Sequence, residues 1–219
     1  GELVAGNYYK FTFTLSNYSA GNVRPYAGSG GAGTYQSADG TYTEVIKCVG
    51  TSSLNMWADI DFVGDIDNVS IVKLHPGYEL VSNGGLDGDT GWSSGLGWTI
   101  AEGVASTNGT QSGSSFLFQD VGIVNGATYE VTYTVSGYIA GQVRPVVGDI
   151  GTGAWAVANG TYTEVIECSD AGQADNISLQ ADADFNGSVD NISVVELREG
   201  LTDTEQITFT ITVSDQNVG

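Results

Sequence analysis

Hydrophobic and polar residues alternate one by one along several segments of this chain, the pattern of a half-buried β-strand. Residues 9–15, 54–62, 177–185 and 207–213 each place an apolar residue at every second position. No long segment shows the 3.6-residue period of an amphipathic helix. The pattern therefore predicts an all-β protein, and Asn-Gly pairs such as those at 83, 108 and 159 mark tight turns between strands.

Part of this pattern occurs twice. Residues 23–48 and 143–168 share Val-Arg-Pro, then Gly-Thr-Tyr-Thr-Glu-Val-Ile and a cysteine, and each residue of the second copy lies 120 positions after its partner. The strand pattern at 54–62 returns at 177–185, offset by 123, so three residues are added in the loop before it, where insertions are tolerated. A chain of 219 residues has room for two ordinary domains, and the repeat predicts two.

We expect the first domain to span 1–76 and the second 77–198, joined at His75-Pro76-Gly77. The second has a front end, residues 78–123, that the first lacks. Without the roughly two or three strands that this front end holds at typical strand length, the first domain would expose apolar faces and unpaired strand edges. We expect residues upstream of Gly1, or another segment, to fill the gap.

Residues 199–219 form a tail with its own strand signal at 206–213. Two interpretations stay open. The tail starts a third domain, which is the favoured interpretation, or it pairs with a neighbouring chain by strand addition. The predicted fold class is thus two tandem antiparallel β-sandwich domains plus an extra C-terminal strand.

The net charge of the chain limits the classes of partner that it is expected to bind. The chain has 26 acidic and six basic residues, for a formal net charge of −20. It should repel phosphate backbones and anionic membranes, so nucleic acid is not expected as a partner. No apolar run reaches the roughly 18 residues of a membrane span, so membrane insertion is not expected. Such an acidic composition suits an extracellular setting. Cys48 and Cys168 are equivalent positions in separate domains, which predicts buried free thiols.

Spaced strand signatures resemble a known family. They comprise Asn83-Gly84-Gly85-Leu86, Gly91-Trp92, Trp98, the Gly-x-x-Tyr-x-Val-x-Tyr motif of residues 126–133, the Gly-Thr-Tyr-Thr-Glu motif of residues 160–164, and Asp190-Asn191-Ile192-Ser193-Val194. The chain is similar to the carbohydrate-binding-module, galactose-binding-like jelly-roll family, in a variant resembling modules of tailed-phage virion proteins. The resemblance covers residues 78–197 fully and 3–74 in part. It implies jelly-roll sandwiches, glycan binding, and a place in a fibre, tail or decoration assembly on a virion surface.

Exposed aromatic rings are what such modules use to hold sugars, because the apolar face of a sugar stacks on them. Trp57 lies on the polar face of its strand, where the other repeat has Gln180. Trp155 lies in the Gly-rich loop, opposite Tyr35 of the first repeat, and Tyr26 stands beside Arg24. The competing interpretation of Trp57 is packing against a neighbouring loop or domain. Trp92 and Trp98 are expected in the core.

Each repeat also keeps an arginine, Arg24 or Arg144. A guanidinium group can hold a ligand hydroxyl or carboxylate with a fork of hydrogen bonds. A salt bridge to one of the many acidic residues, for instance Glu44 or Glu164 on the next strand, is the favoured interpretation, because acidic residues greatly outnumber basic ones.

Calcium is a further candidate ligand. Residues 182–190 begin like a calcium loop, but Ser193 stands where the closing Glu is needed, so that interpretation is poor. The family resemblance implies a different structural calcium site, in which Asp190 of the last strand meets the N-terminal segment near Asn83 and Asp87. Hard oxygen ligands of this kind suit calcium.

Catalysis is not expected. His75 is the single histidine and lies in the linker, so no Ser-His-Asp or Cys-His set can form within a domain. The predicted function is a non-catalytic structural or adhesive surface protein, with glycans and other copies or structural proteins of an assembly as partners. The alternatives are a spacer that binds no sugar, and the binding module of a secreted polysaccharide-degrading enzyme.

Overall fold

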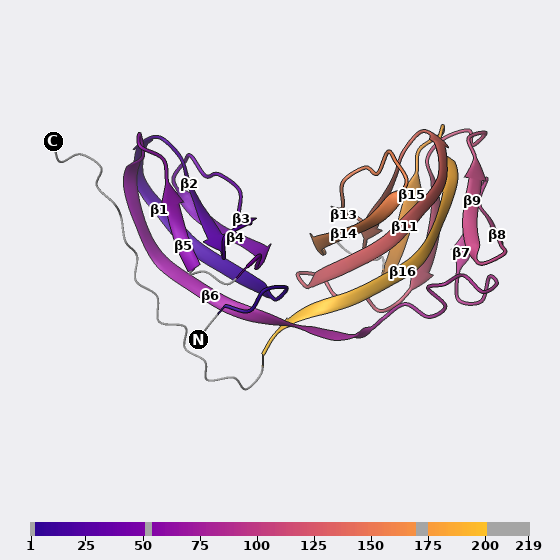
Figure 1. Cartoon of the computed structure of the whole chain (residues 1–219), viewed down its shortest axis with the longest axis horizontal. Coiled ribbons are helices and arrows are strands. Elements are labelled where there is room, and N and C mark those ends of the chain that lie inside the picture. The colour runs from indigo at the N-terminus through magenta and orange to yellow at the C-terminus, as the bar shows by residue number, and fades with distance from the viewer. Residues whose placement is uncertain (1–2, 51–53, 170–174, 201–219) are drawn as a thin grey trace. The chain divides into compact units, whose positions relative to one another are not determined.

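The structure, a computed structural model, describes residues 3–50, 54–169 and 175–200, and all regular elements in these ranges are β-strands (Figure 1). In the same ranges there is no helix long and apolar enough to cross a membrane. The chain divides into two compact units. One holds the described residues up to His75 together with Glu199 and Gly200, and the other is Pro76–Arg198.

The second unit is a sandwich of two antiparallel sheets. One sheet has the strand order β14-β11-β16-β9-β8 and the other has β13-β12-β15-β10-β7. The strands are β7 (Ser93–Ser94), β8 (Thr99–Ala101), β9 (Val104–Asn108), β10 (Ser115–Asp120), β11 (Thr128–Ala140), β12 (Val143–Val147), β13 (Gly151–Thr152), β14 (Gly160–Glu167), β15 (Asn176–Ala181) and β16 (Asn186–Glu199). The predicted all-β sandwich fold is confirmed.

One continuous core fills this second sandwich, because both sheets turn alternate apolar residues inward. Leu117 of β10, Val131 of β11 and Leu179 of β15 are all fully buried. Trp92 and Trp98 are buried as well, and the Trp98 ring packs against Phe185 with 6.1 Å between centroids. The prediction that both tryptophans serve the core is therefore confirmed.

The first unit has the same plan with fewer strands. Its sheets have the orders β6-β1-β4 and β3-β2-β5, and no described strand takes the places of β7, β8, β9 and β10. The strands are β1 (Tyr8–Ala20), β2 (Val23–Ala27), β3 (Gly31–Ala32), β4 (Gly40–Lys47), β5 (Leu54–Ala58) and β6 (Val63–Glu79), and the residues of β6 from Pro76 onward belong to the second unit. The strand predicted at 206–213 lies outside the described residues.

The two copies of the sequence repeat also pair their strands in the same register. Thr12 of β1 pairs with Thr43 of β4, and Thr132 of β11 pairs with Thr163 of β14. The hydroxyls of these pairs lie 3.1 and 3.0 Å apart, a cross-strand contact that adds to sheet stability. Cys48 and Cys168 are both buried and free, as predicted.

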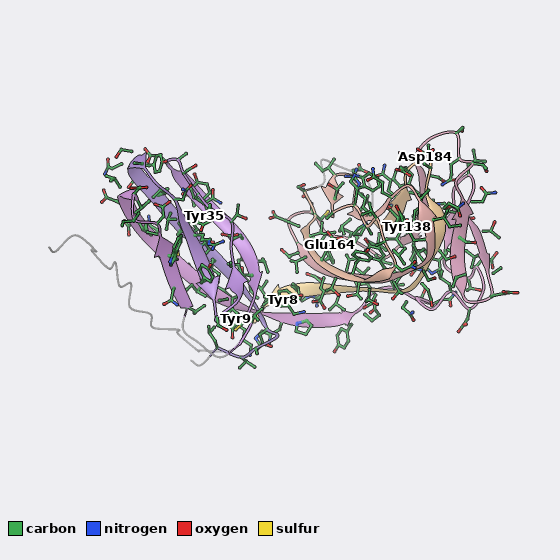
Figure 2. The ribbon with its side chains drawn as sticks, turned by 45° about the horizontal axis from the view of Figure 1, so that its top comes forward. Tyr8, Tyr9, Tyr35, Tyr138, Glu164 and Asp184 are labelled. Atoms are coloured by element: carbon green, nitrogen blue, oxygen red, sulfur yellow. The ribbon has the colours of Figure 1, made fainter. Side chains whose placement is uncertain are left out.

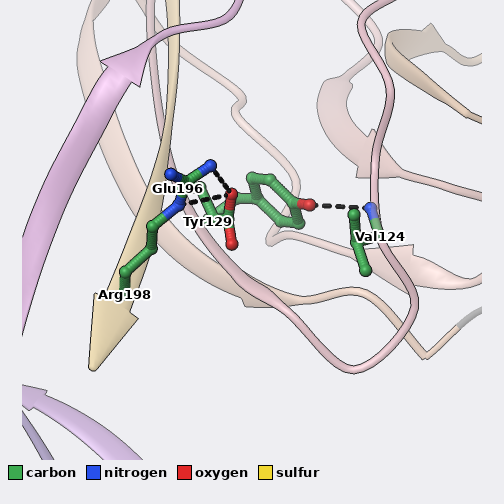
Figure 3. A network of polar contacts seen from close by, with 4 residues as sticks. All are labelled: Val124, Tyr129, Glu196 and Arg198. Carbon is green, nitrogen blue, oxygen red and sulfur yellow. Dashed lines mark hydrogen bonds and ion pairs between the residues drawn. The ribbon is translucent and has the colours of Figure 1, made fainter. Parts of the chain in front are cut away.

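In each repeat the hydroxyl of a buried tyrosine bonds to the backbone five residues earlier in the chain. The hydroxyl of Tyr129 accepts a hydrogen bond from the backbone N–H of Val124 at 2.8 Å (Figure 3). Tyr9 accepts one from Val4 in the same way, at 3.2 Å. Burial raises the pKa of Tyr129, so the phenol stays neutral at ordinary pH. Figure 3 also shows the adjacent surface ion pair, in which Arg198 donates to Glu196 at 2.6 Å.

Candidate functional site

The outer face of the small sheet in the first unit carries most of the predicted site residues. Along β2 the odd-numbered residues face the core, and Val23 is fully buried. Arg24 and Tyr26 therefore point to the outer face, since side chains alternate along a strand. On the neighbouring strand β5, Trp57 is the register partner of Arg24. Strand pairing thus brings together residues that are more than 30 positions apart in sequence.

The guanidinium group of Arg24 lies among three aromatic rings. Its Cζ atom is 4.1 Å from the ring centroid of Tyr35, 4.7 Å from that of Tyr26 and 5.6 Å from that of Trp57. The Nη2 atom donates a hydrogen bond to the hydroxyl of Tyr26. These are cation–π distances, so Arg24 is attracted to all three rings and favours this arrangement of their side chains.

Two of the rings remain open to solvent. Tyr35 is 44% exposed and Trp57 is 45% exposed, which is high for large aromatic side chains. Their centroids lie 5.9 Å apart with an edge-to-face angle of 61°. Tyr35 is labelled in Figure 2. We call Arg24, Tyr26, Tyr35 and Trp57 together the aromatic cluster.

A carboxylate positions the loop that carries Tyr35. Glu44 of β4 accepts the backbone N–H of Thr34 at 2.8 Å. In the second unit, Glu164 (labelled in Figure 2) accepts the backbone N–H of Ala154 at 2.6 Å, beside Trp155. Burial raises the pKa of both carboxyls, although the hydrogen bond from the loop opposes this shift.

The salt bridges expected between the repeat arginines and these two glutamates are absent from the described parts of the chain, so that prediction is wrong. Arg24 contacts aromatic rings instead, and Glu44 is taken by a backbone amide. The physical reason is the loop after β3, which brings its own N–H to the carboxylate. Charge counting alone does not reveal the path of that loop.

The second unit carries a related but smaller arrangement. Arg144 donates from Nε to Gln180 Oε1 at 2.8 Å, and its Cζ lies 4.3 Å from the ring centroid of Trp155. Phe116 of β10 is the register partner of Gln180 on its other side and is 38% exposed. The sequence interpretation missed Phe116. Its signal is the run of three apolar residues at 116–118, because a run in a strand places apolar side chains on both faces.

The residues of the predicted calcium site already make local contacts. Asp190 accepts a hydrogen bond from the backbone N–H of Asn191 at 2.5 Å and one from its side-chain amide at 3.0 Å. The backbone N–H of Asp87 donates to Asn83 Oδ1 at 2.9 Å, which closes the loop at 83–87. An ionised carboxylate has about four acceptor positions, so these contacts are compatible with a bound cation.

Among the described residues no group of three His, Cys, Asp or Glu side chains is suited to a metal ion. A calcium site at Asp190 and Asp87 would therefore need backbone carbonyls and water as further ligands. It stays a prediction.

No family model matches this chain, and the search of curated proteins gave no match. Among solved structures, two variants of CBM29-2, a family 29 carbohydrate-binding module, are similar to it. The first has 16% identity and a TM-score of 0.36, covering 51% of this chain and 84% of that chain. The second has 19% identity and a TM-score of 0.33, covering 50% and 83%.

Allantoicase from Saccharomyces cerevisiae is also similar, with 10% identity and a TM-score of 0.31, covering 87% of this chain and 74% of that chain. TM-scores this low carry no argument about ligand or activity. The aromatic cluster is therefore interpreted from its own geometry.

Proposed function

We propose that the aromatic cluster of the first unit binds a glycan without catalysis. The observation that carries this proposal is a pair of large rings, Tyr35 and Trp57, that stay 44% and 45% exposed although Arg24 contacts both of them. Exposed aromatic side chains of this size need a reason, and a stacking platform for an apolar sugar face supplies one.

The chemistry of the face suits a neutral sugar. The rings offer apolar contact with C–H groups, while Arg24 and the exposed Asn55 of β5 bring polar groups to the same surface. Side chains that are already positioned lose less entropy on binding. Strand pairing positions Trp57, and the hydrogen bond from the loop to Glu44 positions Tyr35. Arg24 contacts both rings.

Trp155 and Phe116 of the second unit are proposed as a second, weaker platform. Trp155 is only partly exposed, and Phe116 is 38% exposed, so less ring surface is available than in the first unit. Two unlike platforms on one chain would give multivalent binding to a repeating polysaccharide.

The setting proposed for this activity is extracellular, on a virion fibre, tail or decoration protein, with other copies or structural proteins as partners. The net charge of −20 and the tandem repeat support it, because a strongly acidic, repeated module suits a soluble spacer that also adheres. Imaging native particles with an antibody against this chain tests it. Labelling of a virion surface is expected, and labelling of a secreted hydrolase instead would contradict it.

A glycan array followed by calorimetry tests the activity itself. We expect a neutral glycan to bind and Trp57→Ala to weaken that binding at least about tenfold, which corresponds to roughly 1.4 kcal/mol. The matched control is Tyr78→Ala, since Tyr78 is 86% exposed but lies outside the aromatic cluster. If no glycan on the array binds, or if the wild type and Trp57→Ala bind with equal affinity, the proposed glycan site is contradicted. The alternative of a spacer that binds no sugar would then be favoured.

A further inference from the structure

The first unit lacks a strand where the second unit has β9. In the second unit, β9 pairs antiparallel with β16, with Ala105 opposite Val189 and Asn108 opposite Asn186. The corresponding part of β6 is residues 63–66.

β6 has β1 on one side and β16 on the other. The hydrogen bond from the Leu80 N–H to the Val194 carbonyl sets an antiparallel register in which β16 ends at Glu199, opposite His75. Along residues 63–71 no described strand therefore covers the side of β6 opposite β1. Such an edge presents a row of unpaired backbone donors and acceptors.

Apolar side chains next to this edge are incompletely covered. Phe185, Val189 and Val194 of the second unit are fully buried, and Ile192 is 3% exposed. Their counterparts in the first unit are only partly buried, although they have the same apolar character. These counterparts are Phe62, Ile66, Val69 and Ile71.

The chain itself leads to this edge. Glu199, the last residue of β16, belongs to the first unit and pairs with Lys10 at 2.9 Å. A Cβ atom added to Gly200 would lie 3.1 Å from the ring of His75. The described chain therefore ends beside β6, a few residues from the edge that lacks a partner.

The residue count also matches. The Leu80–Val194 hydrogen bond places Gly200 opposite Leu74, which is eight residues after Ile66. β6 has one extra residue at its bulge between Asp67 and Ser70, so an antiparallel segment that continues along β6 reaches the level of Ile66 seven residues after Gly200, at Ile207. The alternation at 207–213 then sets the register, because a slip by one residue would turn threonines to the core.

We propose that residues 206–213 of the same chain add to β6 as an antiparallel strand in the position that β9 holds in the second unit. Ile207, Phe209 and Ile211 would cover the partly buried side chains of β6, and Thr208 and Thr210 would face solvent. The C-terminal tail then supplies one of the four strands that have no described counterpart in the first unit. This proposal is independent of glycan binding.

Amide hydrogen exchange measured by NMR tests the proposal on the full chain and on a chain ending at Gly200. In the full chain we expect protection of those β6 amides at 63–71 that do not face β1. Removing 201–219 should reduce this protection at least about tenfold. The internal control is the β16 segment 186–189, which β9 covers in both chains.

A pair of point variants separates a specific strand from a general effect of the tail. Phe209→Lys should lower the protection of the β6 edge, and Thr210→Lys should leave it unchanged. Equal effects of the two variants would overturn the assigned face, and unchanged protection after truncation would overturn the proposal.

Sedimentation of the full chain decides which copy supplies the strand. A monomer with a protected β6 edge is expected. Protection that appears only in a dimer would overturn the same-chain assignment and identify a second copy as the donor.

Discussion

Tyr133 and Phe13 occupy the same position in the two repeats, and they differ by one buried hydroxyl. The ring of Tyr133 stacks on Tyr162 with 5.4 Å between centroids, and Phe13 packs on Tyr42 at 5.5 Å. The Tyr133 hydroxyl is buried with no hydrogen-bond partner among the described residues. Burial, the largest cause, raises the pKa of this phenol well above its usual range, so the buried group stays neutral.

We expect Tyr133→Phe to raise the free energy of unfolding of the second unit by about 1 kcal/mol, because it removes an unsatisfied buried polar group. Denaturant unfolding followed by fluorescence measures this, since the buried Trp92 and Trp98 report on that unit. Tyr129→Phe is the matched control and should destabilise, because it removes a hydrogen bond to Val124. A loss of stability in Tyr133→Phe would contradict the expectation.

At single residues, the sequence predicts burial better than it predicts partners. Alternation placed Trp57 on the outer face, where it is 45% exposed. It could not show that Arg24 would contact three rings, because Tyr35 arrives on a loop whose path no periodicity encodes. The same limit explains the wrong salt bridge to Glu44.

At the scale of elements, β4 and β14 each use one glutamate to hold a loop against the small sheet. Glu44 bonds to the loop before Tyr35, and Glu164 bonds to the loop before Trp155. The long alternating strand β1 follows from the sequence. The alternation at 54–62 also predicts β5 but extends too far, since β5 ends at Ala58 and Ile60 is 86% exposed. Two-residue strands such as β3 do not follow from the sequence, since they depend on what the neighbouring strand offers.

The raised pKa of Glu44 and Glu164 predicts a pH-dependent stability. Folding favours the protonated form of each carboxyl, so their contribution is fully present below the ordinary pKa of 4.5 and is lost as pH rises through the raised value. We therefore expect the free energy of unfolding to fall as pH is raised from about 4.5 toward neutrality. Thermal melts at a series of pH values measure it.

Self-repulsion of the net charge of −20 acts in the same direction, so a comparison with variants is needed. Glu44→Gln combined with Glu164→Gln keeps an acceptor for each loop amide and removes the titration. The double variant should show a flatter dependence on pH. The exposed Glu102, changed to Gln, is the control and should leave the slope almost unchanged. Equal slopes of the double variant and the wild type would refute the assignment.

For the whole molecule, the important feature is that two copies of one plan are not equally complete. Besides the end of β6, the second unit has five strands in each sheet, and the first has three described strands in each. The repeat in sequence predicted this difference, because residues 78–123 have almost no counterpart ahead of the first repeat. What covers the first unit could not be predicted from alternation alone. It required the position of Gly200 beside His75.

Because residues 78–123 belong to the second unit alone, the calcium prediction applies to that unit only. Asp190 and Asp67 occupy equivalent positions, and each accepts the N–H of an asparagine with positive φ, 51° at Asn191 and 53° at Asn68. Only the second unit has the loop with Asp87. We therefore expect millimolar calcium to raise the melting temperature of the second unit alone, because a ligand that binds the folded state stabilises it.

Calorimetry with calcium and then with a chelator measures this shift. Asp190→Asn should abolish the response while still accepting the backbone N–H of Asn191. Asp67→Asn, the equivalent change in the first unit, should leave the response intact. Equal melting temperatures with and without calcium would contradict the prediction and leave Asp190, like Asp67, as a residue that supports an irregularity in its strand.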